Sequence, residues 1–355
     1  MVDNSQPEVN QKPRPRPVLP EELIREEPIL EKAYVCVLRE RRFASQAMAI
    51  LANCKHLPCP RHLKRCHGTR IYLAALDRLP EGIHGPAELR QLLADLGLDL
   101  ALLEDELETP QVPAKPARSK AQMRAATAHW PLHFHPDPRL EALLSGAALA
   151  DLAPLESAAQ LVATAARAAV GGTCCSGAAA ILEPSRRGPP RVLALARASL
   201  DRHPLWHAAM LAVDLVAHGQ GGGAWDLKPR QLEGTGKRLR LRVRRPLVFP
   251  PELDSLILVG DDDDDEEEEG NGEEAAYLCT GYWAVLVQEP CPMCAMALLH
   301  SRVARIFYGV GNPRAGVLGS RALLHNVPGL NHRYEVWSGL LEAECARALD
   351  SATTI

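Results

Sequence analysis

The feature that most limits the fold of this chain is an apolar run that leads into two closely spaced cysteines. Trp283 to Val287 predicts a buried strand, Cys291 to Ser301 predicts a helix, and Val303 to Tyr308 predicts another strand. A strand, a helix and a strand in this order indicate a sheet with helices packed on its faces. Cys291 and Cys294 stand where the predicted helix begins.

The same alternation starts further upstream, so we assign residues 147–355 to one α/β domain. It predicts, in order, an Ala-rich helix from Ala147 to about Val170, strands at Ala178 to Leu182 and Val192 to Ala196, and a helix at Leu205 to His218. An insert at about residues 219–276 follows, with a Gly-rich turn, a basic run and an acidic tract. We expect most of this insert to be loop or disordered chain.

The first part of the chain predicts a smaller α+β module at residues 31–107. Its elements are strands at Ala33 to Leu38 and Arg70 to Leu76, and helices at Arg42 to Ala52 and Pro86 to Leu96. Residues 1–30 are rich in Pro, Glu and Arg, and we interpret them as a disordered leader. Three prolines in Glu108 to Arg118 break regular structure, so residues 108–146 are interpreted as linker and junction.

Composition narrows the class of protein. A chain of 355 residues with 46% hydrophobic content can bury a sizeable core, and its length favours two domains. No run approaches the roughly 20 uninterrupted apolar residues of a membrane-spanning helix, and the first residues lack the apolar core of a secretory signal. We therefore expect a soluble, intracellular protein without a membrane partner. In a reducing compartment, closely paired cysteines are better interpreted as metal ligands than as disulfides.

The net charge of -4 hides an uneven distribution. An unbroken acidic tract runs from Asp261 to Glu269, and the rest of the chain is mildly basic. Two basic clusters could neutralise nucleic-acid phosphates: Arg61, Lys64, Arg65 and Arg70 in the module, and Lys237 to Arg245 in the insert. The second cluster could instead neutralise the acidic tract, and either cluster could be a solvated face. We take the first as the candidate RNA-binding site.

The strongest chemical signal combines the cysteine pair with an upstream histidine. Zinc deaminases that act on nucleobases hold their metal with one His, in H-x-E, and two Cys, in P-C-x-x-C. Here His207, Cys291 and Cys294 match those positions, and one imidazole with two thiolates occupies three corners of a zinc tetrahedron. The alternative interpretation is a pair of buried core thiols. We predict a zinc ion, with water or another ligand at the fourth corner.

The proton shuttle of such a centre is missing. Ala209 occupies the Glu position of H-x-E, and a methyl group neither accepts nor donates a proton. Asp214 lies roughly 10 Å further along the helix axis, beyond hydrogen-bonding reach of a metal-bound water. Glu289 precedes the second helix and belongs to the E-P-C motif, so it is no substitute. We infer a centre without catalysis, which is compatible with a zinc ion that only clamps two helices together.

A further group of thiols and imidazoles lies in the module. It comprises Cys54, Cys59, Cys66 and His67, with His56 and His62 between them. The spacing C-x4-C-x6-C-H matches no recurring structural zinc pattern, so we interpret these as core or surface side chains. His129, His133 and His135 flank Trp130 and Phe134, and we expect them to serve packing at the junction.

These motifs resemble those of one family, the non-catalytic subunits of heterodimeric eukaryotic tRNA adenosine deaminases. The resemblance extends from about residue 30 to about residue 350. It is carried by His62 to Arg65, His129 to Pro131, Phe134 to His135, His207 to Met210, Val213 to Val216, Tyr277 to Tyr282, Glu289 to Leu298, Phe307 to Gly309 and Leu330 to Arg333. Members of that family usually carry Val where Ala209 stands, and neither residue can move protons.

The resemblance implies a cytidine-deaminase-like three-layer α/β/α domain preceded by a small α+β RNA-binding domain. It implies pairing with a catalytic deaminase subunit in a heterodimer that converts the wobble adenosine of tRNA to inosine, and an amino-terminal module that helps to hold the tRNA. We accordingly expect the protein in nucleus and cytoplasm. Two alternatives remain: a self-sufficient zinc nucleoside or cytidine deaminase with an unrecognised base, and a metal-free RNA-binding scaffold.

Overall fold

A computed structural model describes residues 14–52, 54–149, 151–167, 177–185, 189–225, 230–231, 242–249 and 277–353. The chain divides into two compact units, one comprising residues 1–20 and 146–355 and the other residues 21–145. The sequence predicted boundaries after residues 30, 107 and 146, so the first two boundaries differ from those of the structure. Each unit is considered by itself below.

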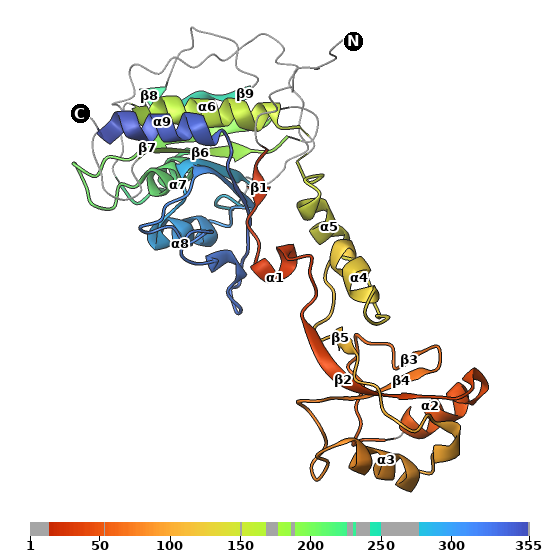
Figure 1. The fold of residues 1–355 in the computed structure, drawn as a ribbon. Helices are drawn as coiled ribbons and strands as arrows, with labels where there is room; N and C mark the ends of the chain where they lie inside the picture. Colours follow the sequence, from red (N-terminus) through yellow and green to blue (C-terminus); the bar gives the residue numbers. More distant parts are fainter. Residues whose placement is uncertain are drawn as a thin grey trace, which may run out of the picture. The chain divides into compact units, whose positions relative to one another are not determined.

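The larger unit is built on an eight-stranded sheet with the strand order β1-β12-β11-β10-β6-β7-β9-β8 (Figure 1). The strands are β1 (Arg16–Pro17), β6 (Ala178–Glu183), β7 (Arg191–Arg197), β8 (Arg230–Gln231), β9 (Arg242–Phe249), β10 (Trp283–Gln288), β11 (Arg305–Val310) and β12 (Glu335–Ser338). β10, β11 and β12 are mutually parallel, whereas β6 runs antiparallel to β10 and to β7. The sheet therefore mixes a parallel half with an antiparallel hairpin.

Helices cover both faces of this sheet. α6 (Ala153–Arg167) and α9 (Glu342–Thr353) pack together on one face, and α7 (Ala208–Gly219) and α8 (Pro292–His300) pack together on the other (Figure 1). The middle four residues of both β10 and β11 are buried, as expected for strands covered on both sides. The predicted three-layer α/β/α domain is confirmed, and so are its strands at β6, β7, β10 and β11.

The predicted disordered leader is wrong for residues 16–18, whereas residues 1–13 lie outside the described residues. β1 pairs antiparallel with β12, so that Arg16 lies opposite Ser338 and Pro17 opposite Trp337. Val18 continues the contact, because its amide donates to the Val336 carbonyl at 2.8 Å. Proline restricts its own φ and the conformation of the residue before it, which favours extended chain, and an edge strand tolerates the missing donor.

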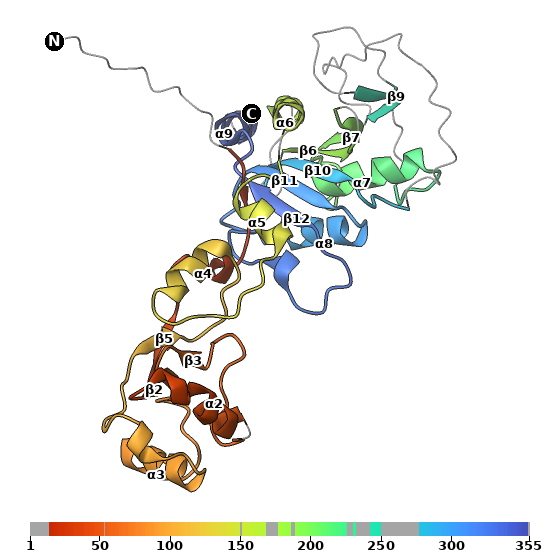
Figure 2. The ribbon, with the colours of Figure 1, turned by 90° about the vertical axis from the view of Figure 1, so that its right-hand side faces the viewer.

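The smaller unit, residues 21–145, contains a four-stranded sheet in the order β3-β4-β2-β5 (Figure 2). Its elements are α1 (Glu21–Ile24), β2 (Leu30–Val37), α2 (Ala44–Ala52), β3 (Cys66–His67), β4 (Arg70–Ala75), α3 (Pro86–Asp95), β5 (Gln111–Pro113), α4 (Lys120–Thr127) and α5 (Pro138–Leu144). Ile71 and Leu73 of β4 pack in the cluster that contains buried residues of α2 and α3, and Tyr72 packs in the cluster that contains Trp130. Alternate residues of β4 therefore pack into two different core clusters.

The predicted linker at 108–146 is also wrong, because this stretch is regular structure of the smaller unit. β5 pairs antiparallel with β2, and Ser119 and Gln122 form a reciprocal capping box at the start of α4. Asp137 caps α5, whose first residue is Pro138. The capping residues Ser119, Gln122 and Asp137 indicate these helix starts, whereas the prolines at 110, 113 and 116 favour a break only before them.

The insert at 219–276 is only partly described. β9 lies within it and pairs parallel with β7, and the antiparallel β8 follows at the edge, so this part is sheet rather than loop. Arg242 to Arg245 of the second basic cluster belong to β9. The rest of that cluster, residues 237–241, and the acidic tract lie outside the described residues.

Candidate metal centre

The three predicted metal ligands meet at the starts of two helices. His207 is the N-cap of α7, Cys291 is the N-cap of α8, and Cys294 lies in the first turn of α8. His207 and Cys291 have extended backbone, so neither belongs to its helix proper. Pro292 at the first helical position of α8 needs no amide partner there. The sequence therefore places two ligands on α8 and one on α7, and the packing of α7 on α8 joins them.

The spacing of the donor atoms fits a tetrahedral zinc site. The Nδ1 atom of His207 lies 3.4 Å from the Cys294 sulfur and 3.7 Å from the Cys291 sulfur. Zn–N and Zn–S bonds of about 2.0 and 2.3 Å in a tetrahedron separate neighbouring donors by about 3.5 to 3.8 Å. The three residues are 9%, 5% and 1% exposed for His207, Cys291 and Cys294 respectively. Among the residues the structure describes, this is the group of His, Cys, Asp and Glu whose donor atoms converge within 4.8 Å, and it contains no carboxylate.

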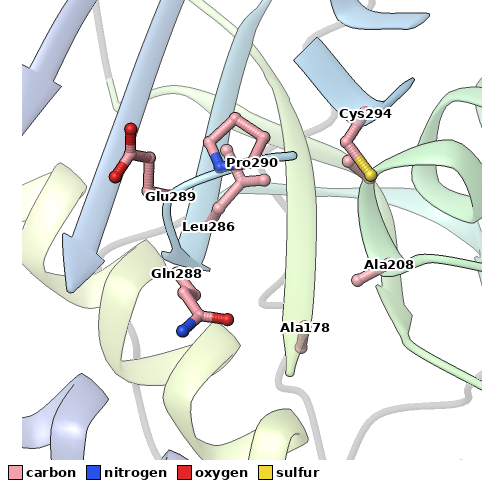
Figure 3. Close-up of a pocket in the computed structure, with 8 residues that line it drawn as sticks. Ala178, Ala208, Leu286, Gln288, Glu289, Pro290 and Cys294 are labelled. Carbon is pink, nitrogen blue, oxygen red and sulfur yellow. The ribbon is translucent and has the colours of Figure 1, made fainter. Parts of the chain in front are cut away.

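A small cavity lies beside Cys294 (Figure 3). Ala209 forms part of its wall. Its volume is about 10 Å³, and its other lining residues include Ala208, Leu286 and Gln288. A cavity of that size holds about one water molecule, whereas pockets for small ligands measure about 300 to 1,000 Å³. The cavity beside Ala209 is therefore too small for a nucleobase.

Glu289 also borders this cavity, but its carboxylate turns to the other side of Pro290, away from Cys294 (Figure 3). Fully buried, it accepts hydrogen bonds from the amides of Asn312, Leu318 and Ser320 at 2.9, 2.7 and 3.0 Å, and from the Ser320 hydroxyl. Such a carboxylate organises the loop after β11 instead of serving as a base. Gly316 is required there, because a Cβ atom on it would clash with the Glu289 carboxylate.

Asp214, the other alternative base, has its carboxylate oxygens in contact with groups away from the ligands. It is buried in α7, and its Oδ1 atom accepts a 2.6 Å hydrogen bond from the Ala224 amide. Its Oδ2 atom lies 3.4 Å from Nε2 of His218, one turn further along α7. The Asp214 carboxylate thus fixes the turn after α7 and is absent from the converging group at His207.

The four predicted RNA-binding residues do not share one environment. Arg65 is half-buried, and its guanidinium donates to the Leu51 carbonyl at 3.1 Å and to the Leu57 carbonyl, so it stabilises the end of α2. Arg70 forms an exposed ion pair with Glu108 at 2.9 Å.

Arg61 and Lys64 are exposed. The Lys64 carbonyl accepts a 2.7 Å hydrogen bond from Nε1 of Trp130, and its amide donates to Pro131 at 3.0 Å. The segment that carries both cations is therefore held against the segment around Trp130. These two side chains are the ones of the four that the fold leaves available.

The other cysteines and histidines of the module are dispersed. Cys54 is buried, the Cys59 thiol donates to the Pro60 and Leu63 carbonyls, and the Cys66 thiol donates to Gly68. Burial raises the pKa of Cys59 despite the opposing charge of Arg65. His129, His133 and His135 are exposed, and the rings of Trp130 and His67 meet edge to face at 5.9 Å. The predicted packing role of the three histidines is thus limited.

A three-layer α/β/α domain with one His and two Cys at paired helix starts defines a deaminase-like protein. Comparison with known proteins narrows this class. A Homo sapiens protein named "Probable inactive tRNA-specific adenosine deaminase-like protein 3" is 33% identical over 90% of this chain and 88% of its own length. The Rattus norvegicus protein of the same name is 34% identical over 90% of this chain and 86% of its own length. The chain belongs to the family of tRNA-specific adenosine deaminase-like protein 3.

Other comparisons are more local. A Schizosaccharomyces pombe protein named "tRNA-specific adenosine deaminase subunit tad3" is 42% identical over 19% of this chain and 22% of its own length. A solved structure from studies of adenosine-to-inosine editing by tRNA deaminases covers 48% of this chain and 83% of its own, at 19% identity and a TM-score of 0.29. No protein-family model matches the chain.

No helix in the described part of the chain is long and apolar enough to cross a membrane. Two features of the site are not predicted by the sequence: the loop that encloses Glu289 and the small size of the cavity at Ala209. The Glu-Pro-Cys motif together with Gly309, Gly311, Gly316 and Gly319 was a signal for the first. No sequence signal reports the second.

Proposed function

We propose that this chain is the non-catalytic, zinc-binding subunit of a tRNA adenosine deaminase, and that it supports a catalytic partner subunit. The observation that carries the proposal is the contrast at one site: three ligand atoms converge at zinc-like distances, while Ala209 occupies the proton-shuttle position beside a cavity of about 10 Å³. The names of the relatives, which call them inactive, support the same conclusion.

His207, Cys291 and Cys294 would hold the zinc ion. In active deaminases that ion activates a water for attack on the base. In this chain no carboxylate of the described residues shares the site, so the general acid–base contribution, typically about 10²- to 10⁴-fold, is absent. The ligands instead tie the start of α7 to the start of α8, which is a structural role.

The partner and the substrate follow from the family. A relative is named a subunit of a tRNA-specific adenosine deaminase, which supports assembly with a second, catalytic chain. The reaction of the complex is the conversion of the wobble adenosine of tRNA to inosine, as the resemblance implies. This chain contributes assembly and a grip on the tRNA.

The grip on RNA is assigned to Arg61 and Lys64 of the module. Both are exposed, and the segment that carries them is fixed by the hydrogen bonds of Lys64 to Trp130 and Pro131. Exposed cations on a backbone that is held in place suit contact with a phosphate backbone. Arg65 and Arg70, which have partners within the module, support this surface indirectly.

Reconstitution tests the proposal. The purified chain, the catalytic subunit and their complex are each incubated with a tRNA that carries adenosine at the wobble position, and inosine is measured by mass spectrometry. We expect inosine from the complex alone. Inosine made by this chain without its partner would overturn the proposal, and so would a catalytic subunit whose activity is unchanged by this chain.

Two side measurements separate the alternatives. Ammonia release from free nucleosides by this chain, lost in Asp214→Asn, would indicate a self-sufficient deaminase. A folded chain that binds RNA without any zinc would indicate a metal-free scaffold.

A further inference from the structure

The loop from Gly311 to Arg321, which follows β11, is unusually well fixed for an exposed loop. Two of its turns close on themselves, because the Gly316 amide donates to Asn312 at 2.7 Å and the Arg321 amide donates to Gly316 at 3.1 Å. The buried Glu289 carboxylate accepts hydrogen bonds from the amides of Asn312 and Ser320. The backbone on both sides of the loop is therefore held by one internal carboxylate.

This rigid loop presents two arginines to solvent. Arg314 lies inside the Asn312 turn, where the Ala315 amide donates to the Asn312 side chain at 3.1 Å. Arg321 directly follows Ser320, which binds Glu289 through both its amide and its hydroxyl. Both arginines are exposed, and within the described part of the chain neither guanidinium has an acidic partner. The loop thus holds two uncompensated positive charges on a preorganised backbone.

The loop lies at the edge of the sheet that carries the metal centre. β10 and β11 are parallel, so their carboxyl ends meet at one edge. β10 leads through Glu289 and Pro290 to the ligand Cys291, and β11 leads into the arginine loop. A 3.2 Å hydrogen bond from the Val317 amide to the Pro290 carbonyl joins the two directly. The arginines and the metal centre therefore share one edge of the deaminase-like domain.

The neighbours of the arginines favour a polyanion with a phosphate backbone over a protein partner. A protein interface normally has an apolar centre. Here the apolar side chain of Leu318 is buried, Val317 is half-buried, and both pack towards the domain core. A guanidinium on a fixed backbone matches a phosphate with two parallel hydrogen bonds and keeps its charge at any physiological pH.

We propose that Arg314 and Arg321 form an RNA-backbone contact in the deaminase-like domain, separate from the cations of the amino-terminal module. This inference rests on the proposed function in one respect, since it requires that the chain binds RNA. It adds a second contact surface, on the domain whose own centre lacks a proton shuttle. The RNA would then be held at the edge of that domain without a base entering the cavity at Ala209.

The test compares two double variants of the full chain in binding to unmodified tRNA transcript at several salt concentrations. Arg314→Ala/Arg321→Ala should weaken binding by about fivefold to tenfold and lower the slope of log affinity against log salt by about 1 to 2. Arg302→Ala/Arg333→Ala removes two exposed charges from the same domain, neither with an acidic partner among the described residues, and serves as the matched control, with less than about a twofold change expected. Circular dichroism and zinc content of each variant show that the domain stays folded.

The outcomes distinguish this inference from the proposed function. If the unaltered chain fails to bind the transcript, the proposed RNA grip itself is wrong. Suppose instead that the unaltered chain binds and that Arg61→Ala/Lys64→Ala weakens binding, whereas Arg314→Ala/Arg321→Ala does not. Only the second contact is then overturned. The second contact would also be overturned if Arg314→Ala/Arg321→Ala abolished binding to polyglutamate but left the affinity for RNA unchanged. That result would show that the loop binds an acidic protein.

Discussion

The candidate metal centre of the deaminase-like domain and the basic segment of the amino-terminal module, residues 61–65, differ in burial. The first gathers buried side chains at one point, and the second exposes cations to solvent. His207, Cys291 and Cys294 are buried, converge on one point and come from two helix starts. Arg61 and Lys64, the proposed RNA contacts, are exposed on one segment whose backbone is fixed at Lys64. When several buried ligands share one ion, removal of one ligand releases the ion and leaves the other ligands buried without a partner. Exposed cations contribute separately, and each contributes little.

This difference predicts that variants of the two regions will differ in kind as well as in size. Changes at the metal centre should alter stability and metal content, and changes at the basic segment should alter RNA affinity and its salt dependence. A variant of the basic segment that unfolded the protein, or a ligand variant that only weakened RNA binding, would contradict the distinction.

The largest effect is expected from Cys294→Ser. Loss of a thiolate removes the zinc and leaves a buried hydroxyl beside His207, so the domain should lose about 3 to 5 kcal/mol of stability. Thermal unfolding with parallel zinc determination measures this. Cys279→Ser is the matched control: burial raises the pKa of this thiol to about 12, it is no part of the converging group, and its substitution should leave zinc content unchanged.

A second large effect is expected from Gly316→Ala. The added methyl group would clash with the Glu289 carboxylate, which must then give up hydrogen bonds from the loop, at a cost of about 2 to 3 kcal/mol. Gly219→Ala is the control, since no atom lies within 4 Å of a Cβ there. Chemical denaturation of both variants gives the comparison. Equal stability of the two would show that the Glu289 loop is not tightly packed.

Within the basic segment, Arg65 and Lys64 should have different roles, Arg65 in stability and Lys64 in RNA binding. Arg65→Ala removes hydrogen bonds to the Leu51 carbonyl at the end of α2 and to the Leu57 carbonyl in the following segment, and should cost about 1 to 2 kcal/mol. Lys64→Ala should change stability by less than about 0.5 kcal/mol and weaken RNA binding severalfold. Hydrogen exchange of the α2 amides, measured beside RNA titrations, tests both. Faster exchange in Lys64→Ala than in Arg65→Ala would reverse the assignment.

The smallest effect concerns the buried His325, whose Nε2 atom lies 2.9 Å from the Val18 carbonyl at the end of β1. Burial lowers the pKa of His325, although the hydrogen bond to Val18 acts in the opposite direction. As the pH falls below about 6.5, the unfolded chain takes up the proton first, so the stabilisation by neutral His325 is present above that pH and is lost below it. The difference in unfolding midpoint between the unaltered chain and His325→Gln should therefore narrow from pH 8 to pH 5.5. A constant difference would show that protonation of His325 is not linked to folding.

The sequence was sufficient where local pattern and packing agree. The middle four residues of β10 and of β11 are buried because helices cover both faces, and the Pro-Cys-x-x-Cys start of α8 carries its own signal. His207 could be assigned because it lies upstream of the cysteine pair, in a helix that follows two strands, as the histidine of zinc deaminases does. The converging ligands follow from those two helix starts.

Long-range contacts were beyond the sequence. β1 is a two-residue strand whose partner β12 lies more than 300 residues away, and no periodicity identifies such a pair. The different roles of Lys64 and Arg65 depend on which carbonyls surround each side chain after folding. The cavity at Ala209 depends on how four segments pack, so its volume is a property of the assembled core.

The central claim is that the ligand set holds a zinc ion although the proton shuttle is gone. Elemental analysis of the purified, folded chain measures this directly. We expect about one zinc per chain. A folded chain that contains no zinc after purification in its presence would contradict it.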